Sequence, residues 1–169
     1  MYWESDANAI GAFSTTPTIY SASLGSYNIY TLRNRVSNAR NVWNSAGVPC
    51  IITTGGNAKI KVYGGSFAEV KEKYSGFKSS WAGATISSYT TNPGYYLYRG
   101  IRKYHRTFQS STVYVLSTNT YPQNVINHEI GHALGFIGHI PSAGNVMYGV
   151  TQPVTALTLR DRRHLNQIH

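Results

Sequence analysis

Acidic residues are scarce in this chain of 169 residues, because six Asp and Glu stand against 15 Lys and Arg and give a net charge of +9. So few acids leave no acidic loop, which argues against a structural calcium site. The excess of cations favours an anionic surface or polymer as a partner, although general solubility is the simpler explanation because no basic run is long. The densest basic cluster, Arg99 to Arg106, matches no nucleic-acid motif, so we expect no specific nucleic-acid partner.

Cysteine and long apolar runs are equally scarce. The single cysteine, Cys50, excludes an internal disulfide bond, and its place at the head of an apolar run predicts burial. No apolar run is long enough to cross a bilayer, so we expect no transmembrane segment. The first residues lack the basic and apolar regions of a signal peptide. With only 12% charged residues and many Tyr, Ser, Thr and Asn, the composition favours a mature secreted domain from which a signal peptide has been removed.

The length and the absence of repeats or linkers predict one domain over residues 1–169, which we expect to be a monomer. Helical spacing of apolar residues predicts a first helix at 31–47 and a second from Pro122 to Gly135. A third helix is predicted to begin near Thr158. The expected buried positions of the first helix are Leu32, Val36, Ala39 and either Val42 or Trp43, and those of the last helix are Leu159, Leu165 and Ile168.

Runs of β-branched and aromatic residues predict a series of strands between the first two helices. The strands are expected at residues 48–54, 58–65, 84–91, 95–101 and 111–118, while residues 66–74 fit either a short helix or a strand. Helices and strands thus occur in one domain, which predicts an α+β fold.

The segment NHEIGHALGFIGH, residues 127–139, has the pattern of a zinc site. In a helix, His128 and His132 lie on one face about 6 Å apart along the axis, so that both imidazoles can reach one ion. Glu129 follows the first histidine and is placed to act as a general base on a water molecule. We therefore predict one catalytic Zn²⁺ with His128 and His132 as ligands.

A third protein ligand is needed, and no glutamate follows Glu129 in the sequence. The remaining candidates are His139, Asp161, His164 and His169. Gly135 can end the helix in a left-handed conformation and turn the chain back toward the metal, which favours His139.

The sequence HEIGHALGFIGH followed by NVMYG resembles the metzincin superfamily of zinc endopeptidases, and within it most closely the matrixins. The family pattern places its third histidine at Gly138, so His139 stands one residue late. His139 nevertheless precedes Met147 by eight residues, which is the matrixin interval, and one extra loop residue beside Gly138 can be accommodated. The resemblance therefore also implies His139 as the third ligand, with Met147 in the turn beneath the zinc histidines.

The resemblance implies a metzincin-like zincin fold with a twisted mixed sheet, an active-site helix, and subdomains of about residues 1–135 and 136–169, the second ending in a helix. It also implies that the strand before the active-site helix forms the cleft rim, where Tyr114 and Leu116 would pair with substrate. An interior position for this strand is an equally good interpretation.

The resulting hypothesis is a zinc-dependent endopeptidase that acts on protein or peptide substrates, with Glu129 as the general base. Two alternatives stay open. One is a catalytically silent module that binds anionic polymers, and the other is a zinc amidase that acts on cell-wall material.

Overall fold

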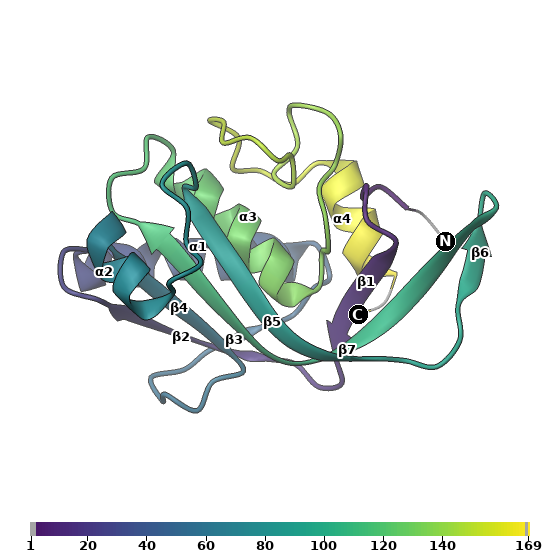
Figure 1. Cartoon of the computed structure of the whole chain (residues 1–169), viewed down its shortest axis with the longest axis horizontal. Helices are drawn as coiled ribbons and strands as arrows, with labels where there is room; N and C mark the ends of the chain where they lie inside the picture. Colours follow the sequence, from purple (N-terminus) through teal and green to yellow (C-terminus); the bar gives the residue numbers. More distant parts are fainter. Residues whose placement is uncertain (1–2, 168) are drawn as a thin grey trace.

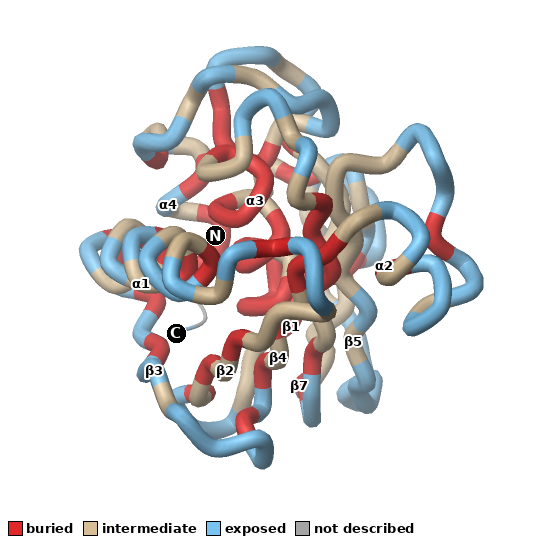
Figure 2. The backbone as a smooth tube through the Cα atoms, turned by 90° about the vertical axis from the view of Figure 1, so that its left-hand side faces the viewer, coloured by how far each residue is buried: buried red, intermediate tan, exposed pale blue. Residues whose placement is uncertain are grey.

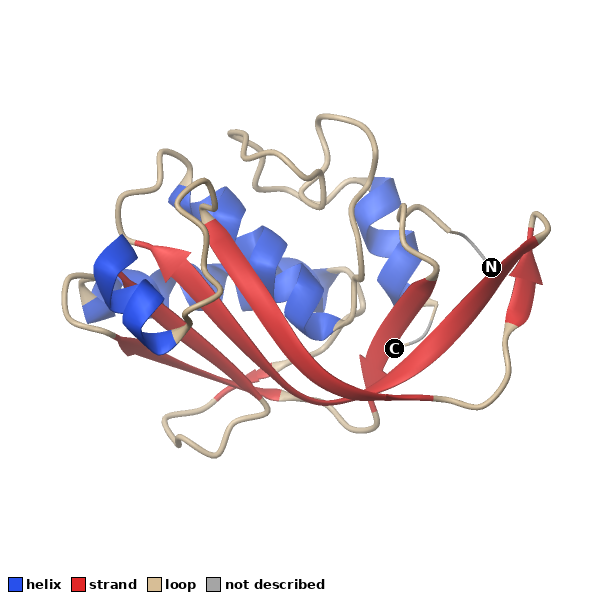
Figure 3. Cartoon of the chain, in the orientation of Figure 1, coloured by secondary structure: helices blue, strands red, loops and turns tan. Residues whose placement is uncertain are grey.

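In the computed structural model, which describes residues 3–167 and 169, seven strands form one mixed sheet (Figure 1). The parallel strands are β1 (Ala9–Phe13), β2 (Thr18–Ser23), β3 (Ile51–Ile52), β4 (Ile60–Gly65) and the long β7 (Ile101–Leu116). Two strands pair antiparallel with β7, namely β5 (Gly83–Thr91) and β6 (Tyr96–Tyr98). The predicted α+β class is confirmed at this level: a mostly parallel sheet combined with four helices in the described residues (Figure 3).

Strand β7 lies inside the sheet. Val113 pairs with Val62 of β4 on one side and with Thr85 of β5 on the other. The prediction that this strand forms a cleft rim is therefore wrong, and Tyr114 and Leu116 are both buried. Its β-branched and apolar residues cover both faces, as is typical of a central strand. Among the described residues β5 pairs only with β7, so β5 is an edge strand.

The helices cover the two faces of the sheet unequally. Val113 and Val115 face the larger core, which contains residues of α1 (Ile29–Ser45), α3 (Pro122–Leu134) and α4 (Leu159–Asn166). Tyr114 and Leu116 alternate with them and face the smaller core under α2 (Phe67–Lys73). Figure 2 shows buried segments on α3 and on the inner strands of the sheet, while the outer loops are exposed. The site described below lies on the face of the larger core.

The predicted first helix is confirmed as α1, and its buried residues are Leu32, Val36, Ala39 and Trp43. Trp43 is fully buried, and its indole Nε1 donates a hydrogen bond to the carbonyl of Asn127 in α3. Cys50 is buried as expected. These contacts fix the helix that carries the histidines against the rest of the core.

One open segment is now assigned, and two predicted strands differ from their predicted form. Residues 66–74 fold as a helix because Ser66 and Glu69 form a capping box at its start. Residues 95–101 are not one strand but the start of a hairpin: Arg99 (φ 51°) and Gly100 (φ 79°) form a tight turn between β6 and β7. The predicted strand at 48–54 is reduced to Ile51–Ile52.

The last helix, α4, buries fewer of its apolar residues than predicted. Leu165 is buried, but Leu159 is 67% exposed, so that part of the prediction is wrong. The physical reason is the capping box of Thr158 and Asp161, which turns the first helical residue toward solvent. The predicted burial of Ile168 lies outside the described residues.

Candidate metal centre

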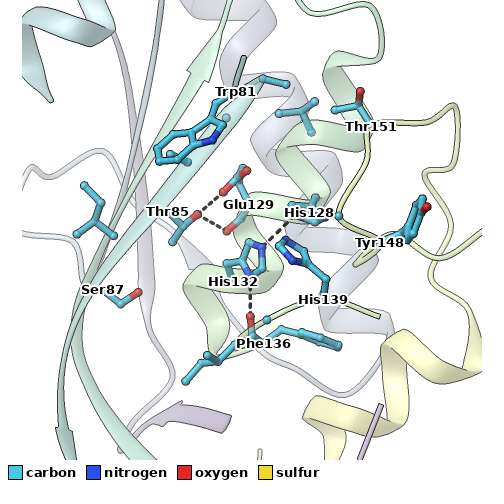
Figure 4. Close-up of a pocket in the computed structure, with 18 of the residues that line it drawn as sticks. Trp81, Thr85, Ser87, His128, Glu129, His132, Phe136, His139, Tyr148 and Thr151 are labelled. Carbon is cyan, nitrogen blue, oxygen red and sulfur yellow. Dashed lines mark hydrogen bonds between the residues drawn. The ribbon is translucent and has the colours of Figure 1, made fainter. Parts of the chain in front are cut away.

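Helix α3 presents the first two histidines on one face, as the spacing predicts. The helix has Pro122 in its first turn and ends at Gly135, whose φ of 122° only glycine adopts readily. The Nε2 atoms of His128 and His132 lie 3.0 Å apart (Figure 4). Both side chains therefore point at the same place.

The hydrogen bond made by Nδ1 of each ring determines that Nε2 is the nitrogen available to a metal. Nδ1 of His128 lies 2.8 Å from the carbonyl oxygen of Val146, and Nδ1 of His132 lies 2.6 Å from that of Phe136. A carbonyl can only accept, so both Nδ1 atoms carry the proton and donate it. The two Nε2 atoms then face each other with lone pairs, an arrangement that is repulsive by itself and favourable around a cation.

His139 completes the cluster. Its ring centroid lies 5.2 Å from that of His128 and 5.1 Å from that of His132. One ligand atom from each of the three residues lies within 4.8 Å of the others, which is close enough for one metal ion. These three imidazoles are the ligand number and type that catalytic zinc sites use, so the residues fit zinc.

The loop between α3 and His139 takes its shape from its glycines and from contacts with the N-terminal segment. Gly138 has a φ of 76°, and a Cβ there would clash with Asp6. The Asp6 carboxylate accepts a hydrogen bond from the backbone N–H of His139 at 2.7 Å, and the Asp6 N–H donates to the His139 carbonyl at 2.9 Å. Ser5 donates from its hydroxyl to the carbonyl of Ile137. Residues far apart in the sequence thus hold the third histidine in place.

All three imidazoles are held neutral. Burial lowers the pKa of His128 to about 4, lowers that of His132 well below its usual value, and lowers that of His139 against the opposing effect of Asp6. Neutral imidazole is the form that binds metals. The protein environment therefore keeps the ligands ready for a cation at neutral pH.

Glu129 lies beside the histidines at the wall formed by β5. It is 6% exposed, and its carboxylate accepts a hydrogen bond from the Thr85 hydroxyl at 2.6 Å. Burial raises the pKa of Glu129 to about 7, and the bond from Thr85 opposes this effect. A Cβ at Gly83 would contact the Glu129 side chain, so the absence of a side chain there leaves room for the carboxylate.

Met147 is fully buried against α3. A Cβ at Gly131 would clash with the Met147 sulfur and with the Trp43 ring, which explains why a glycine occupies the position before the second histidine. The backbone N–H groups of Val146 and Met147 donate to the carboxylate of Asp161. Asp161 thus fixes the turn that contains Met147.

The other candidate ligands lie elsewhere. Asp161 is the capping residue just described, and His164 is buried against Trp3 and Phe136. His169 is hydrogen-bonded to the carbonyl of Leu134. Within the described part of the chain, His128, His132 and His139 form the single group suited to a metal.

A cleft of about 750 Å³ opens along the three histidines and Glu129. One wall is β5, and the opposite wall is the chain from Phe136 to Gly138 together with the segment Tyr148–Thr151. Figure 4 shows Thr85 of β5 and Glu129 of α3 pointing toward each other, with a hydrogen bond between their side chains. The free edge of β5 therefore runs along the cleft beside the three histidines.

Two residues of the site carry no signal in the sequence. Thr85 lies in an ordinary polar strand, and Asp6 stands far from the motif. Their roles arise only when the sheet and the N-terminal segment pack against α3.

Comparison with known proteins adds no relative. No protein-family model matches the chain, and no curated protein shows significant similarity to it. Among the described residues, no helix combines the length and the apolar character needed to cross a membrane.

Proposed function

We propose that this chain is a zinc-dependent endopeptidase of the matrixin-like metzincin type. The observation that carries the proposal is the combination of three convergent imidazoles, an adjacent buried glutamate and the free edge of β5 along the same cleft. His128, His132 and His139 would hold the zinc. A zinc ion bound there would polarise a carbonyl group and lower the pKa of water.

The residues of the chain perform the remaining tasks. The free N–H and C=O groups of β5 can pair with an extended peptide and hold one of its bonds beside the histidines. Glu129 accepts a proton from the attacking water and returns it to the departing amine. Thr85 keeps the Glu129 carboxylate turned toward the cleft through its 2.6 Å hydrogen bond.

The free strand edge also favours a polypeptide over the other substrates considered. A strand edge recognises a regular series of backbone N–H and C=O groups, which isolated amides of cell-wall material do not offer. A silent module that binds polymers would not require a buried carboxylate next to three neutral imidazoles.

The test is the variant Glu129→Gln, compared with Glu72→Gln on the exposed surface of α2. We expect both variants to keep one zinc per chain, and we expect Glu129→Gln to cleave a peptide library at least about 100-fold more slowly than the parent. The rates are measured by mass spectrometry of the cleavage products. A Glu129→Gln variant that cleaves as fast as Glu72→Gln would contradict the role of Glu129.

A further inference from the structure

The stretch of chain that forms one wall and one end of the cleft carries cations and no acids. Residues 73–128, which include β5, β6 and β7, contain no Asp or Glu. The same stretch contains six cations, namely Lys73, Lys78, Arg99, Arg102, Lys103 and Arg106. This stretch therefore carries six positive charges that no acid within it offsets, and three of them, Arg102, Lys103 and Arg106, lie on β7.

Arg106 brings this charge into the cleft itself. It lies on β7 between Gly11 of β1 and Thr91 of β5, and its side chain lines the cleft together with Tyr89 and Phe108. The guanidinium carbon lies 4.1 Å from the centre of the Tyr89 ring, a cation–π contact that orients the group. Its Nε atom is buried without a hydrogen-bond partner.

No carboxylate in the described residues neutralises Arg106. The ion pairs there join Glu4 to Arg160 and Arg163, far along the chain. Glu129, the acid in the cleft, is hydrogen-bonded to Thr85. A buried donor without a partner is costly, and a ligand that supplies an acceptor removes that cost.

The basic character continues beyond the cleft along the same side of β7. Alternate residues of a strand share a face, which places Arg102, Tyr104 and Arg106 together. The Arg102 guanidinium lies 4.6 Å from the ring centre of Tyr95, and that ring lies 6.2 Å from the ring of Tyr104. We call these five residues, Tyr89, Tyr95, Arg102, Tyr104 and Arg106, the arginine–tyrosine face. It extends from the cleft toward the β6 hairpin, which projects from the molecule in Figure 1.

We propose that the arginine–tyrosine face binds acidic side chains of a polypeptide substrate, on the N-terminal side of the bond held beside Glu129. This inference rests on the proposed function for the position of that bond. An added strand pairs slightly better antiparallel than parallel, so a peptide on β5 would run from Thr91 toward Gly83. Tyr89 and Thr91 lie four and six residues beyond Thr85, or roughly 13 to 20 Å at the rise of a strand.

Acidic residues about four to six positions before the cleaved bond would therefore reach Arg106. The guanidinium can bind a carboxylate through two parallel hydrogen bonds, while the tyrosine rings offer contact area on either side. Because the face is continuous with the free edge of β5, one extended polypeptide can occupy both.

The test measures binding, in a background that removes turnover. Zinc-loaded Glu129→Gln protein is titrated into two fluorescent peptides that differ only in carrying Glu or Gln at the N-terminal positions. We expect the acidic peptide to bind at least about tenfold more tightly than the Gln peptide. We expect added salt to reduce this ratio of the two affinities. Adding Arg106→Gln should reduce the ratio about tenfold, because a charged hydrogen bond is lost.

The matched control is Arg33→Gln on the exposed surface of α1, which changes the net charge equally and should leave the ratio unchanged. Thermal unfolding of each variant verifies that it is folded, and Arg106→Lys, which keeps the charge, should restore part of the ratio if a variant is unstable. Equal affinity for both peptides, or a ratio that Arg106→Gln does not change, would overturn the proposal. So would binding of a sulfated polysaccharide by a protein that does not distinguish the two peptides.

The outcome also separates this inference from the proposed function. An acidic peptide that binds through Arg106 while the parent cleaves no peptide would support the arginine–tyrosine face and contradict the protease. If the parent cleaves peptides at the same rate with or without acidic residues before the cleaved bond, the protease is supported and the role of the arginine–tyrosine face is contradicted.

Discussion

Asp6 shows how a single side chain outside the motif can determine the metal centre. Its carboxylate accepts from the N–H of His139, and its own N–H donates to the His139 carbonyl. Groups that orient metal ligands typically change metal affinity by 10- to 100-fold when they are removed. Asp6 therefore acts as a positioning residue for the third ligand.

We expect Asp6→Ala to weaken zinc binding about tenfold or more, and Asp6→Asn to weaken it less because the amide oxygen can still accept. Affinity is measured by competition with a chelator, with Glu72→Gln as a control for the lost charge. A loss of thermal stability in the metal-free protein with unchanged zinc affinity would show that Asp6 has a purely structural role.

At the scale of secondary-structure elements, α3 depends on the close contact between Gly131 and Met147. A Cβ at Gly131 would clash with the Met147 sulfur and the Trp43 ring, both of which are fully buried. Overpacking of this kind costs about 1–3 kcal/mol, whereas alanine alone would stabilise a helix by about 1 kcal/mol over glycine.

We therefore expect Gly131→Ala to lower the free energy of unfolding by up to about 2 kcal/mol in net terms. The control is Gly56→Ala, where a Cβ would meet nothing within 4 Å. Urea unfolding of both variants provides the comparison. If Gly131→Ala proved more stable than the parent, Met147 and Trp43 would not pack against α3 as described.

The helices α1, α3 and α4 and the three histidines could be predicted because their signals are local, whereas α2 stayed open between a helix and a strand. The apolar spacing in α1 and the residues Pro122 and Gly135 at the two ends of α3 lie within a few turns of sequence. Strands β1 and β2 were not predicted, since their short segments with small residues are stabilised by pairing with β7 and β4. The edge position of β5 is likewise a property of the sheet, because nothing in its own residues distinguishes an edge from an interior strand.

At the scale of the whole molecule, a metal ion held by the three histidines would connect α3 to the loop that contains His139. A ligand that binds only the folded state stabilises it, by about 2.7 kcal/mol at 100 times its dissociation constant. In a domain of this size, that corresponds to a melting temperature higher by roughly 5–10 °C.

We expect a chelator to lower the melting temperature of the parent by that amount and to have little effect on His139→Ala. Elemental analysis after dialysis against a weak chelator should find one zinc per chain in the parent and far less in His139→Ala. His105→Ala, which changes a histidine outside the cluster, serves as the control. Equal zinc in the parent and His139→Ala would exclude His139 as a required ligand.

The contacts that Glu4 and Asp6 make with the C-terminal part of the chain also affect when a metal centre could form during synthesis. Asp6 bonds to a residue 133 positions later, and Glu4 pairs with Arg160 and Arg163, 156 and 159 positions later. The ribosome synthesises Glu4 and Asp6 long before their partners His139, Arg160 and Arg163. A growing chain therefore contains His128 and His132 before the contacts that hold the segment around His139 can all form, so a metal centre would be complete only after Arg163 has been synthesised.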